Sequence, residues 1–301
     1  MRQKIRYWYG AMTGVRKPEW IRYKTPGGQG YLNVKRCVGE LNLHTICTEA
    51  KCPNAGDCFS NNTATFLIMG NKCTRDCLYC AVQKSSPEPP DYGEPERIAE
   101  AVSRLGLKYA VITSVTRDDL SDGGASLFAE TSSCIKRRVP ECGVELLVPD
   151  FRGYHIDSLD IIKESNPDVL NHNIETVEKI FPVLRPSGSY NHSLALIKYA
   201  SETGFIVKSG LMIGFGETIG DIKDTMKNLY NSGCSMLTVG QYLSPGKNHY
   251  EVKKYYHPEE FEEIRLIGED MGFKKIQSAP NVRSSYHAAL LSETYKIYEK
   301  A

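Results

Sequence analysis

Six of the ten cysteines in this 301-residue chain fall into two close groups of three. The first group is Cys47, Cys52 and Cys58, and the second is Cys73, Cys77 and Cys80, with spacings C-x4-C-x5-C and C-x3-C-x2-C. Three thiolates can hold a [4Fe–4S] cluster and leave its fourth iron without a cysteine ligand. Such an iron can bind a cofactor or a substrate. The two groups therefore predict two iron–sulfur clusters that face one active site.

Two other uses of close cysteines fit this chain less well. A disulfide framework belongs to small secreted domains, whereas this chain starts with polar residues and lacks the apolar run of a secretory signal. A structural zinc site needs four ligands, usually as two cysteine pairs, but here the cysteines come in threes with only His44 nearby. We therefore expect iron–sulfur chemistry in the cytoplasm, where thiols stay reduced.

The remaining cysteines are scattered, and we expect them to be small buried apolar residues. They are Cys37, Cys134, Cys142 and Cys234. Composition is that of an ordinary soluble globular protein, with 41% hydrophobic and 24% charged residues. A net charge of +1 creates no field that would attract nucleic acid or an anionic membrane. No apolar stretch approaches the roughly 20 residues that span a bilayer.

From about residue 64 onward, short apolar or β-branched runs alternate with segments of helical periodicity. The runs cover residues 65–69, 109–113, 144–148, 168–172, 205–212 and 236–240. Repeated β-then-α units predict a parallel sheet, and six units are too few for the eight-unit barrel. We predict an α/β fold, a partial (β/α)6 TIM-like barrel with N-terminal and C-terminal extensions. A doubly wound open sheet is the alternative.

The predicted barrel divides the chain into three parts. Residues 1–60 form an N-terminal extension that carries the first cysteine group, residues 61–280 form the barrel, and residues 281–301 form a C-terminal extension with a helix. Val34, Val38 and Leu41 predict a short helix before the first cysteine group. Thr218 followed by Asp221 is typical of a helix start. In both candidate folds, ligands gather at the carboxyl ends of the strands, and the second cysteine group follows the first strand.

Residues 73–80 resemble the signature of radical S-adenosylmethionine enzymes, and a longer series of segments resembles the lipoyl synthase family within that superfamily. The segments are residues 17–20, 44–54, 64–66, 113–120, 122–125, 149–151, 171–176, 208–212, 240–243 and 283–288. They occur in the family's order over nearly the whole chain. The resemblance is therefore much more specific than the cysteine spacing alone.

The resemblance implies two [4Fe–4S] clusters with different tasks. Cys73, Cys77 and Cys80 would hold the cluster that binds and cleaves S-adenosylmethionine, while Cys47, Cys52, Cys58 and Ser285 would hold an auxiliary cluster. In this family, deoxyadenosyl radicals abstract hydrogen atoms from C6 and C8 of an octanoyl group, and the auxiliary cluster donates the two sulfur atoms. The octanoyl group is attached to a lysine of a lipoyl carrier domain, which is the protein substrate.

The resemblance also implies further residues and partners. Tyr79 would lie near adenine, where Phe is usual; Asp122, Gly123 and Gly124 would meet the methionine amine; Asn173 and Glu175 would contact the ribose or methionine; and Arg185 would meet the carboxylate. Purely structural roles are the alternatives for these residues: a plain turn at Asp122, a helix cap at Glu175 and a surface position for Arg185. We expect His172 to be buried with its hydrogen bonds satisfied. An electron donor such as ferredoxin or flavodoxin and a cluster-repair protein are expected partners.

Two competing functions follow from the same cysteines. One is sulfur insertion into a free small molecule, as in biotin synthase, which the first cysteine group and residues 283–285 make less favourable. The other is an iron–sulfur electron carrier or assembly scaffold, which would bind clusters but would not cleave S-adenosylmethionine.

Overall fold

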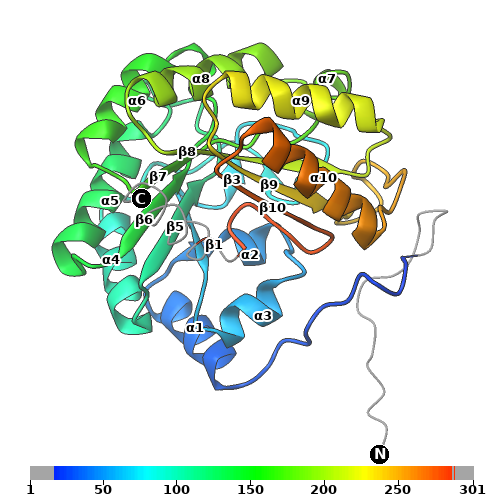
Figure 1. Cartoon of the computed structure of the whole chain (residues 1–301). Helices are drawn as coiled ribbons and strands as arrows, with labels where there is room; N and C mark the ends of the chain where they lie inside the picture. Colours follow the sequence, from blue (N-terminus) through cyan, green and yellow to red (C-terminus); the bar gives the residue numbers. More distant parts are fainter. Residues whose placement is uncertain (1–16, 287, 289–301) are drawn as a thin grey trace, which may run out of the picture.

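The computed structural model describes residues 17–286 and 288, and its main element is one eight-stranded sheet (Figure 1). The strands are β1 (His44–Thr45), β2 (Thr65–Ile68), β5 (Tyr109–Ser114), β6 (Gly143–Leu147), β7 (Val169–Asn171), β8 (Val207–Ile213), β9 (Met236–Gln241) and β10 (Lys275–Ala279). Their order in the sheet is the order in the chain. From β2 to β10 all neighbours are parallel, and β1 adds to β2 antiparallel.

This topology confirms the partial TIM-like barrel. A doubly wound sheet reverses its strand order at a switch point, and no such reversal occurs here. All six predicted strands are present, and β10 is a seventh parallel strand that the sequence analysis missed. Its sequence, KIQSA, has only Ile276 fully buried. An edge strand of this kind carries neither an apolar run nor a clean alternation, which are the patterns that predict strands.

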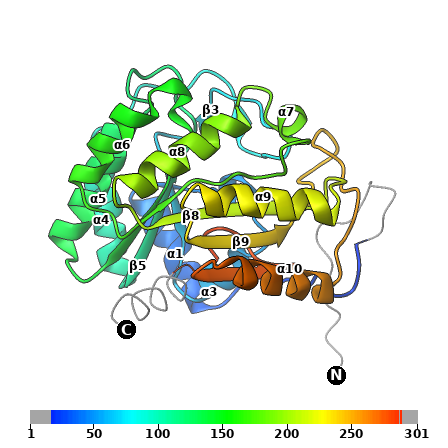
Figure 2. The same ribbon diagram turned by 45° about the horizontal axis from the view of Figure 1, so that its top comes forward.

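Helices line the outer side of the curved sheet (Figures 1 and 2). The helices of the described chain are α1 (Gln29–Glu40), α2 (Ile46–Glu49), α3 (Ala55–Ser60), α4 (Glu94–Leu105), α5 (Ala125–Arg138), the 3-10 helix η1 (Phe151–Gly153), α6 (His155–Glu164), α7 (Phe181–Leu184), α8 (Tyr190–Glu202), α9 (Ile219–Asn231) and α10 (Pro258–Met271). The short helix α2 does not belong to the outer layer (Figure 1). The predicted helix around Val34 is α1. Thr218 caps α9 through a complete capping box with Asp221, as predicted.

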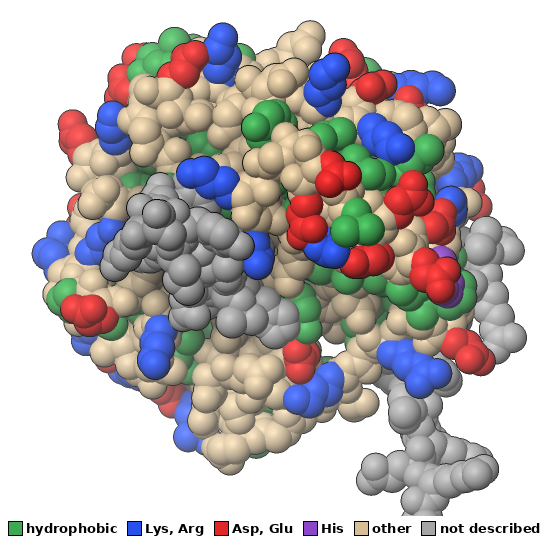
Figure 3. Space-filling model, viewed as in Figure 1, with side chains coloured by type: hydrophobic (Ala, Val, Ile, Leu, Met, Phe, Trp, Pro, Cys, Tyr) green, Lys and Arg blue, Asp and Glu red, His purple; other side chains and the backbone are tan. Residues whose placement is uncertain are grey.

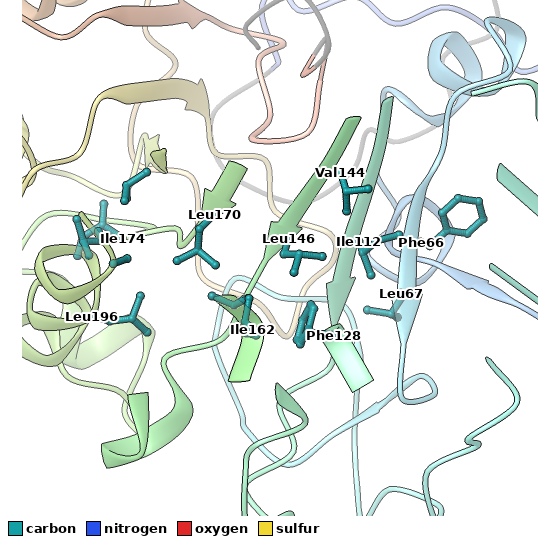
Figure 4. Close-up of a cluster of buried hydrophobic side chains, with 14 of the residues drawn as sticks. Phe66, Leu67, Ile112, Phe128, Val144, Leu146, Ile162, Leu170, Ile174 and Leu196 are labelled. Carbon is teal, nitrogen blue, oxygen red and sulfur yellow. The ribbon is translucent and has the colours of Figure 1, made fainter. Parts of the chain in front are cut away.

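The core lies between the sheet and the outer helices. Neighbouring strands align Ile112, Leu146 and Leu170 in register, and these side chains meet Phe128 of α5 and Ile162 of α6 (Figure 4). Side chains alternate between the two faces of a strand. The residues between these positions therefore point to the interior of the barrel.

The interior of the barrel contains a buried ion pair. Lys208 Nζ lies 2.9 and 3.0 Å from the two carboxylate oxygens of Glu145. The same carboxylate accepts hydrogen bonds from Asn171 Nδ2 and the Tyr109 hydroxyl. Because these residues belong to β5, β6, β7 and β8, the network joins four strands.

The four scattered cysteines are buried, as predicted. On the face seen in Figure 3, basic and acidic side chains are interspersed, in keeping with the small net charge. In the described part of the chain, no helix has the length and apolar character needed to cross a membrane. The predicted C-terminal helix falls almost entirely on residues outside the described part, and the limits of the three predicted parts stay predictions.

Candidate active site

A cavity of ≈1160 Å³ opens at the carboxyl ends of the strands. Its walls include residues that end or follow successive strands, such as Ser114, Asn173, Met212 and Leu243. It is also lined by Cys47, Cys52, Cys73, Cys77, Cys80 and Ser285. The structure thus brings five of the six grouped cysteines and the predicted serine to one cavity. The sixth, Cys58, is not among the residues that line it.

The second cysteine group lies on a loop between the short strands β3 (Lys72–Cys73) and β4 (Gln83–Lys84). Backbone hydrogen bonds fix the loop to the barrel at two points. Thr74 N donates to Thr116 O at 3.2 Å, beyond β5, and Leu78 N donates to Leu184 O at 2.9 Å, at the end of α7. The loop is therefore tied to both sides of the barrel rim.

Arg75, inside this loop, makes the strongest tie. Its guanidinium Nε and Nη2 donate to the two oxygens of Asp118 at 2.8 and 2.7 Å, and Nη1 donates to Asp150 at 2.7 Å. Both Arg75 and Asp150 are buried. Burial alone would raise the pKa of Asp150, but the hydrogen bond and charge of Arg75 outweigh it and leave that pKa well below the ordinary value. The fork geometry of arginine suits such paired carboxylates.

In the first cysteine group, Cys47 lies on α2, Cys58 lies on α3, and Cys52 lies in the short segment between the two helices. Thr45 caps α2 by accepting from Thr48 N, and Cys52 N donates to Cys47 O at 3.0 Å. Burial, and then the charges of its neighbours Cys47 and Cys52, raise the pKa of Cys58 to about 12. Cys58 belongs to the same hydrophobic cluster as Cys47 and Cys52.

The segment that carries Ser285 reaches this cavity because two strands have glycine where it passes. A Cβ on Gly240 of β9 would lie 2.1 Å from Val282 O, and one on Gly210 of β8 would lie 3.2 Å from Ser284 Cβ. Any other residue at Gly240 would collide with backbone. Ser284 Oγ also accepts from Asn173 Nδ2 at 3.2 Å, which links the segment to the end of β7.

A second link joins this segment to the first cysteine group. Asn54 Nδ2, between Cys52 and Cys58 in the chain, donates to Asn281 O at 2.7 Å. Asn281 Nδ2 donates in turn to Arg22 O at 3.1 Å. Segments far apart in the sequence are thus connected beside the cavity.

Four further residues predicted from the resemblance also line the cavity, namely Tyr79, Asn173, Glu175 and Arg185. Asn173 Nδ2 donates to Glu175 Oε1 at 3.3 Å, and Arg185 Nη1 donates to Asn173 O at 3.4 Å. Burial raises the pKa of Glu175, against the opposing charge of Arg185 and hydrogen bonds from Asn173 and Tyr79. Arg185 is 8% exposed, so the surface alternative for it is wrong.

Several buried polar atoms on this wall have no hydrogen-bond partner among the described residues. They are Ser114 Oγ, His172 Nε2, Asn173 Oδ1 and Arg185 Nε. Buried polar groups are costly unless they are hydrogen-bonded. A ligand with amino, carboxylate and hydroxyl groups would satisfy both the donors and the acceptors among them, and S-adenosylmethionine is such a ligand.

His172 departs from its prediction in one respect. It is buried, and its Nδ1 lies 2.9 Å from Val148 O, but its Nε2 has no partner in the described structure. Burial and the nearby charge of Arg185 lower its pKa to about 4. A carbonyl can only accept, so the neutral ring carries its proton on Nδ1 and presents Nε2 as an acceptor.

Asp122, Gly123 and Gly124 are not brought to the cavity wall. The Asp122 carboxylate accepts from Gly124 N and Ser126 N, both at 2.9 Å, at the start of α5. This agrees with the turn alternative, and the contact with the methionine amine stays a prediction.

Neither cysteine group has three ligand atoms within 4.8 Å of one another, and Glu96, Glu130 and Cys134 form the one such group among the described residues. A cubane cluster takes each thiolate on a different iron and therefore spaces its ligands more widely than a single ion does. The cysteine groups fit a cluster better than one metal ion.

The sequence analysis missed Arg75 as a positioning residue and the basic residues around the cavity. Arg75 stands between two cysteines of the second group, and Asp118 and Asp150 follow two of the predicted strands. Strand-end logic already placed these three near one another. The sequence analysis did not predict that Arg75, inside the cysteine loop, pairs with the carboxylates of Asp118 and Asp150 at the strand ends.

Family models match two parts of the chain. The radical SAM superfamily matches residues 67–229, and the N-terminal domain of lipoyl synthase of the radical SAM family matches residues 7–52.

Solved structures of similar fold include methylornithine synthase, with a TM-score of 0.50 and 13% identity over 84% of each chain. Another is Streptococcus suis SuiB bound to S-adenosylmethionine, with a TM-score of 0.54 and 12% identity over 80% of this chain and 52% of that one. At this identity they show the fold alone.

Curated relatives are much more similar in sequence. Lipoyl synthase of Rubrobacter xylanophilus is 48% identical over 90% of this chain and 85% of its own length. Lipoyl synthase of Roseiflexus is 48% identical over 92% of both chains, and that of Thioalkalivibrio sulfidiphilus is 49% identical over 91% and 86%. With these relatives and the two family models, the chain belongs to the lipoyl synthase family of radical S-adenosylmethionine enzymes.

Proposed function

We propose that this protein inserts sulfur at C6 and C8 of an octanoyl group that is amide-linked to a lysine of a lipoyl carrier domain. The observation that carries the proposal is the single cavity lined by Cys47, Cys52, Cys73, Cys77, Cys80 and Ser285. A hydrogen-abstracting cofactor and a sulfur donor must both reach the same carbon atom. One cavity with a cysteine group on each of two wall segments meets this requirement.

Membership of the superfamily implies one [4Fe–4S] cluster and S-adenosylmethionine, and we assign their site to Cys73, Cys77 and Cys80. When reduced by one electron, the bound S-adenosylmethionine supplies a 5′-deoxyadenosyl radical, which abstracts one hydrogen atom from the substrate. The Arg75 bridge to Asp118 and Asp150 keeps the cysteine loop against the strand ends.

The cofactor's polar groups match the part of the wall beside the cysteine loop, where Leu78 N donates to Leu184 O. Arg185 offers a guanidinium to a carboxylate, and Glu175 offers a carboxylate to an amino group or to ribose hydroxyls. His172 Nε2 and Asn173 Oδ1 are free acceptors beside them. These side chains would orient the cofactor, and their burial keeps water from the reacting atoms.

We assign a second, auxiliary cluster to Cys47, Cys52, Cys58 and Ser285, as the source of both sulfur atoms. A serine oxygen is a harder ligand than a thiolate and suits iron less well. A ligand that dissociates readily fits a cluster that must give up its sulfide. If the variant Ser285→Cys turned over at the normal rate, this role of the serine would be wrong.

The cavity also has apolar wall suited to an acyl chain. Val115, Val148, Met212, Leu243 and Val252 line it between the polar groups. Burial of the chain's methylene groups stabilises the bound state by about 0.8 kcal/mol each. The methylene groups of an octanoyl chain offer no polar atom to bind, so these apolar contacts would hold the chain.

The reaction needs partners and a reducing environment, which we propose from the chemistry. Each abstraction consumes one electron, so a donor such as ferredoxin or flavodoxin is needed. Loss of sulfide from the auxiliary cluster requires a cluster-repair protein for further turnovers. Both fit a cytoplasmic location, where thiols remain reduced.

The first test is a count of iron and acid-labile sulfide after anaerobic reconstitution. About eight of each per chain are expected for two [4Fe–4S] clusters, and about four of each would remove the sulfur source. The loaded enzyme is then given octanoyl-lysine peptide, dithionite and S-adenosylmethionine, with free dethiobiotin as the comparison substrate. Two 5′-deoxyadenosine molecules per dithiolated peptide support the proposal, and sulfur insertion into dethiobiotin alone overturns it.

A further inference from the structure

Basic side chains surround the opening of the cavity. Arg22, Lys51 and Lys247 are exposed and line it, and Lys17 and Arg283 line it from partly buried positions. We call these five side chains the cationic rim. They come from four stretches of sequence: the N-terminal segment, the first cysteine group, the residues after β9 and the residues after β10. Seven of the nine Asp, Glu, Lys and Arg residues that line the cavity are basic, although the chain as a whole carries only +1.

No residue of the cationic rim forms an ion pair within residues 17–286 and 288. Arg22 Nε donates only to a backbone carbonyl, Glu19 O, at 2.8 Å. Lys17 Nζ lies 4.2 Å from the centre of the Tyr23 ring. Burial, and then the positive charge of Arg283, lower the pKa of Lys17. Like charges thus converge here without an ion pair, although the exposed Glu19 also lines the cavity.

Most arginines elsewhere on the surface form ion pairs, and Arg36 is an exception among the described residues. Arg97 pairs with Asp91 at 2.6 Å, Arg104 with Glu100 at 2.7 Å, Arg137 with Glu96 at 3.0 Å and Arg265 with Glu262 at 2.6 Å. A basic surface that contacts only solvent would be expected to pair its basic side chains with acidic ones in the same way. The rim therefore has the character of a surface that is completed by an anionic partner.

We propose that the cationic rim is the docking surface for the carrier domain and that it recognises an acidic face around the octanoylated lysine. This inference rests on the proposed function. An acyl-lysine arm that enters the cavity brings the body of its domain against the rim. Acidic side chains there would meet the unpaired cations, steer the encounter and fix the orientation of the domain.

The test compares two substrates that carry the same octanoyl-lysine. One is an intact octanoylated carrier domain, and the other is an octanoyl-lysine tripeptide without acidic residues. The double variant Arg22→Glu/Lys247→Glu reverses two exposed rim charges that are remote in sequence from the cluster cysteines. The control, Lys223→Glu/Lys227→Glu, makes the same change of net charge on the outer helix α9, where both lysines are exposed.

The measured quantity is the ratio of kcat/KM for the domain to kcat/KM for the tripeptide, at low and at high ionic strength. The rim variant should lower this ratio at least about tenfold at low salt, and the control should leave it unchanged. High salt should narrow the difference, since screening weakens exposed charges. Replacing the acids around the carrier lysine by amides should reproduce the loss with the unmodified enzyme.

A ratio that the rim variant leaves unchanged, or that the control lowers equally, overturns the docking surface. A separate anisotropy titration of the labelled octanoylated domain measures binding without turnover. If neither substrate gains sulfur, the proposed function fails, and the titration still decides whether the rim binds the domain. A rim variant that binds the domain as tightly as the unmodified chain rejects the proposal in that case also.

Discussion

At the scale of single residues, the site contains two buried polar side chains, Asp150 and His172, that differ in whether their polar atoms have a partner. Asp150 has the charge of Arg75 beside it, whereas His172 keeps an unpaired nitrogen toward the cavity. The first arrangement stabilises the fold and positions the cysteine loop. The second leaves a group that only a bound ligand can satisfy. Different measurements can therefore separate the positioning residue from the ligand-facing one.

The variant Arg75→Gln should lose the cluster of the second cysteine group. Iron after reconstitution is expected to fall from about eight to about four per chain. The cluster-free chain should lose about 3 kcal/mol of unfolding free energy, because Asp150 stays buried with only Arg185 near it, at 3.6 Å. Urea titration and iron analysis check this. The control Arg137→Gln, whose side chain is 60% exposed, should cost less than about 0.5 kcal/mol. Full iron loading of Arg75→Gln would contradict a positioning role.

His172 should make the cluster-free chain less stable as the pH falls. Its pKa in the folded state is about 4, below the ordinary value near 6.5, so the unfolded chain binds the extra proton first. The contribution is complete above about pH 6.5 and is lost toward pH 4, about 3 kcal/mol in total. Urea unfolding between these pH values should show a shallower slope for His172→Gln. An unchanged slope would mean that another group titrates there.

At the scale of elements, the barrel strands had to leave room for the chain's own C-terminal segment. Gly240 and Gly210 provide it on two neighbouring strands. The sequence analysis identified both the strands and the Arg283–Ser285 motif, but it could not show that one lies across the other. That contact joins positions that are far apart in the sequence, and it depends on the lack of a side chain at the two glycines. No local sequence pattern indicates such a contact.

The variant Gly240→Ala should displace Ser285 from the first cysteine group. The added Cβ would meet Val282 O at 2.1 Å, and backbone cannot rotate away as a side chain can. We expect iron to stay near eight per chain, because three thiolates can hold a [4Fe–4S] cluster, with 5′-deoxyadenosine release retained and sulfur insertion lost. The matched control is Gly246→Ala, whose nearest atom would lie at 3.6 Å. Sulfur insertion at the normal rate by Gly240→Ala would show that the serine segment tolerates the shift.

At the scale of the whole molecule, the fold was predictable because most of its strands are buried runs between helices. The six buried strands and the outer helices follow from periodicity, while β10 escaped because only Ile276 on it is buried. The cysteine groups were visible as spacing, and a shared site was predicted from their closeness in the sequence, while strand-end logic placed only the second group. The cationic rim was not predictable, because its residues are scattered in sequence and their lack of partners is a property of the folded surface.

The whole barrel also depends on the buried pair of Lys208 and Glu145, which joins four strands away from the chemistry. Lys208→Met should destabilise the cluster-free chain by about 3–5 kcal/mol, since it leaves the Glu145 carboxylate buried with only the neutral donors Asn171 and Tyr109. Adding Glu145→Gln removes that charge and should restore at least half of the loss. Urea titrations of both single variants and the double variant measure the coupling. If the double variant is no more stable than Lys208→Met, the cost comes from lost packing, and the barrel does not rely on this charge pair.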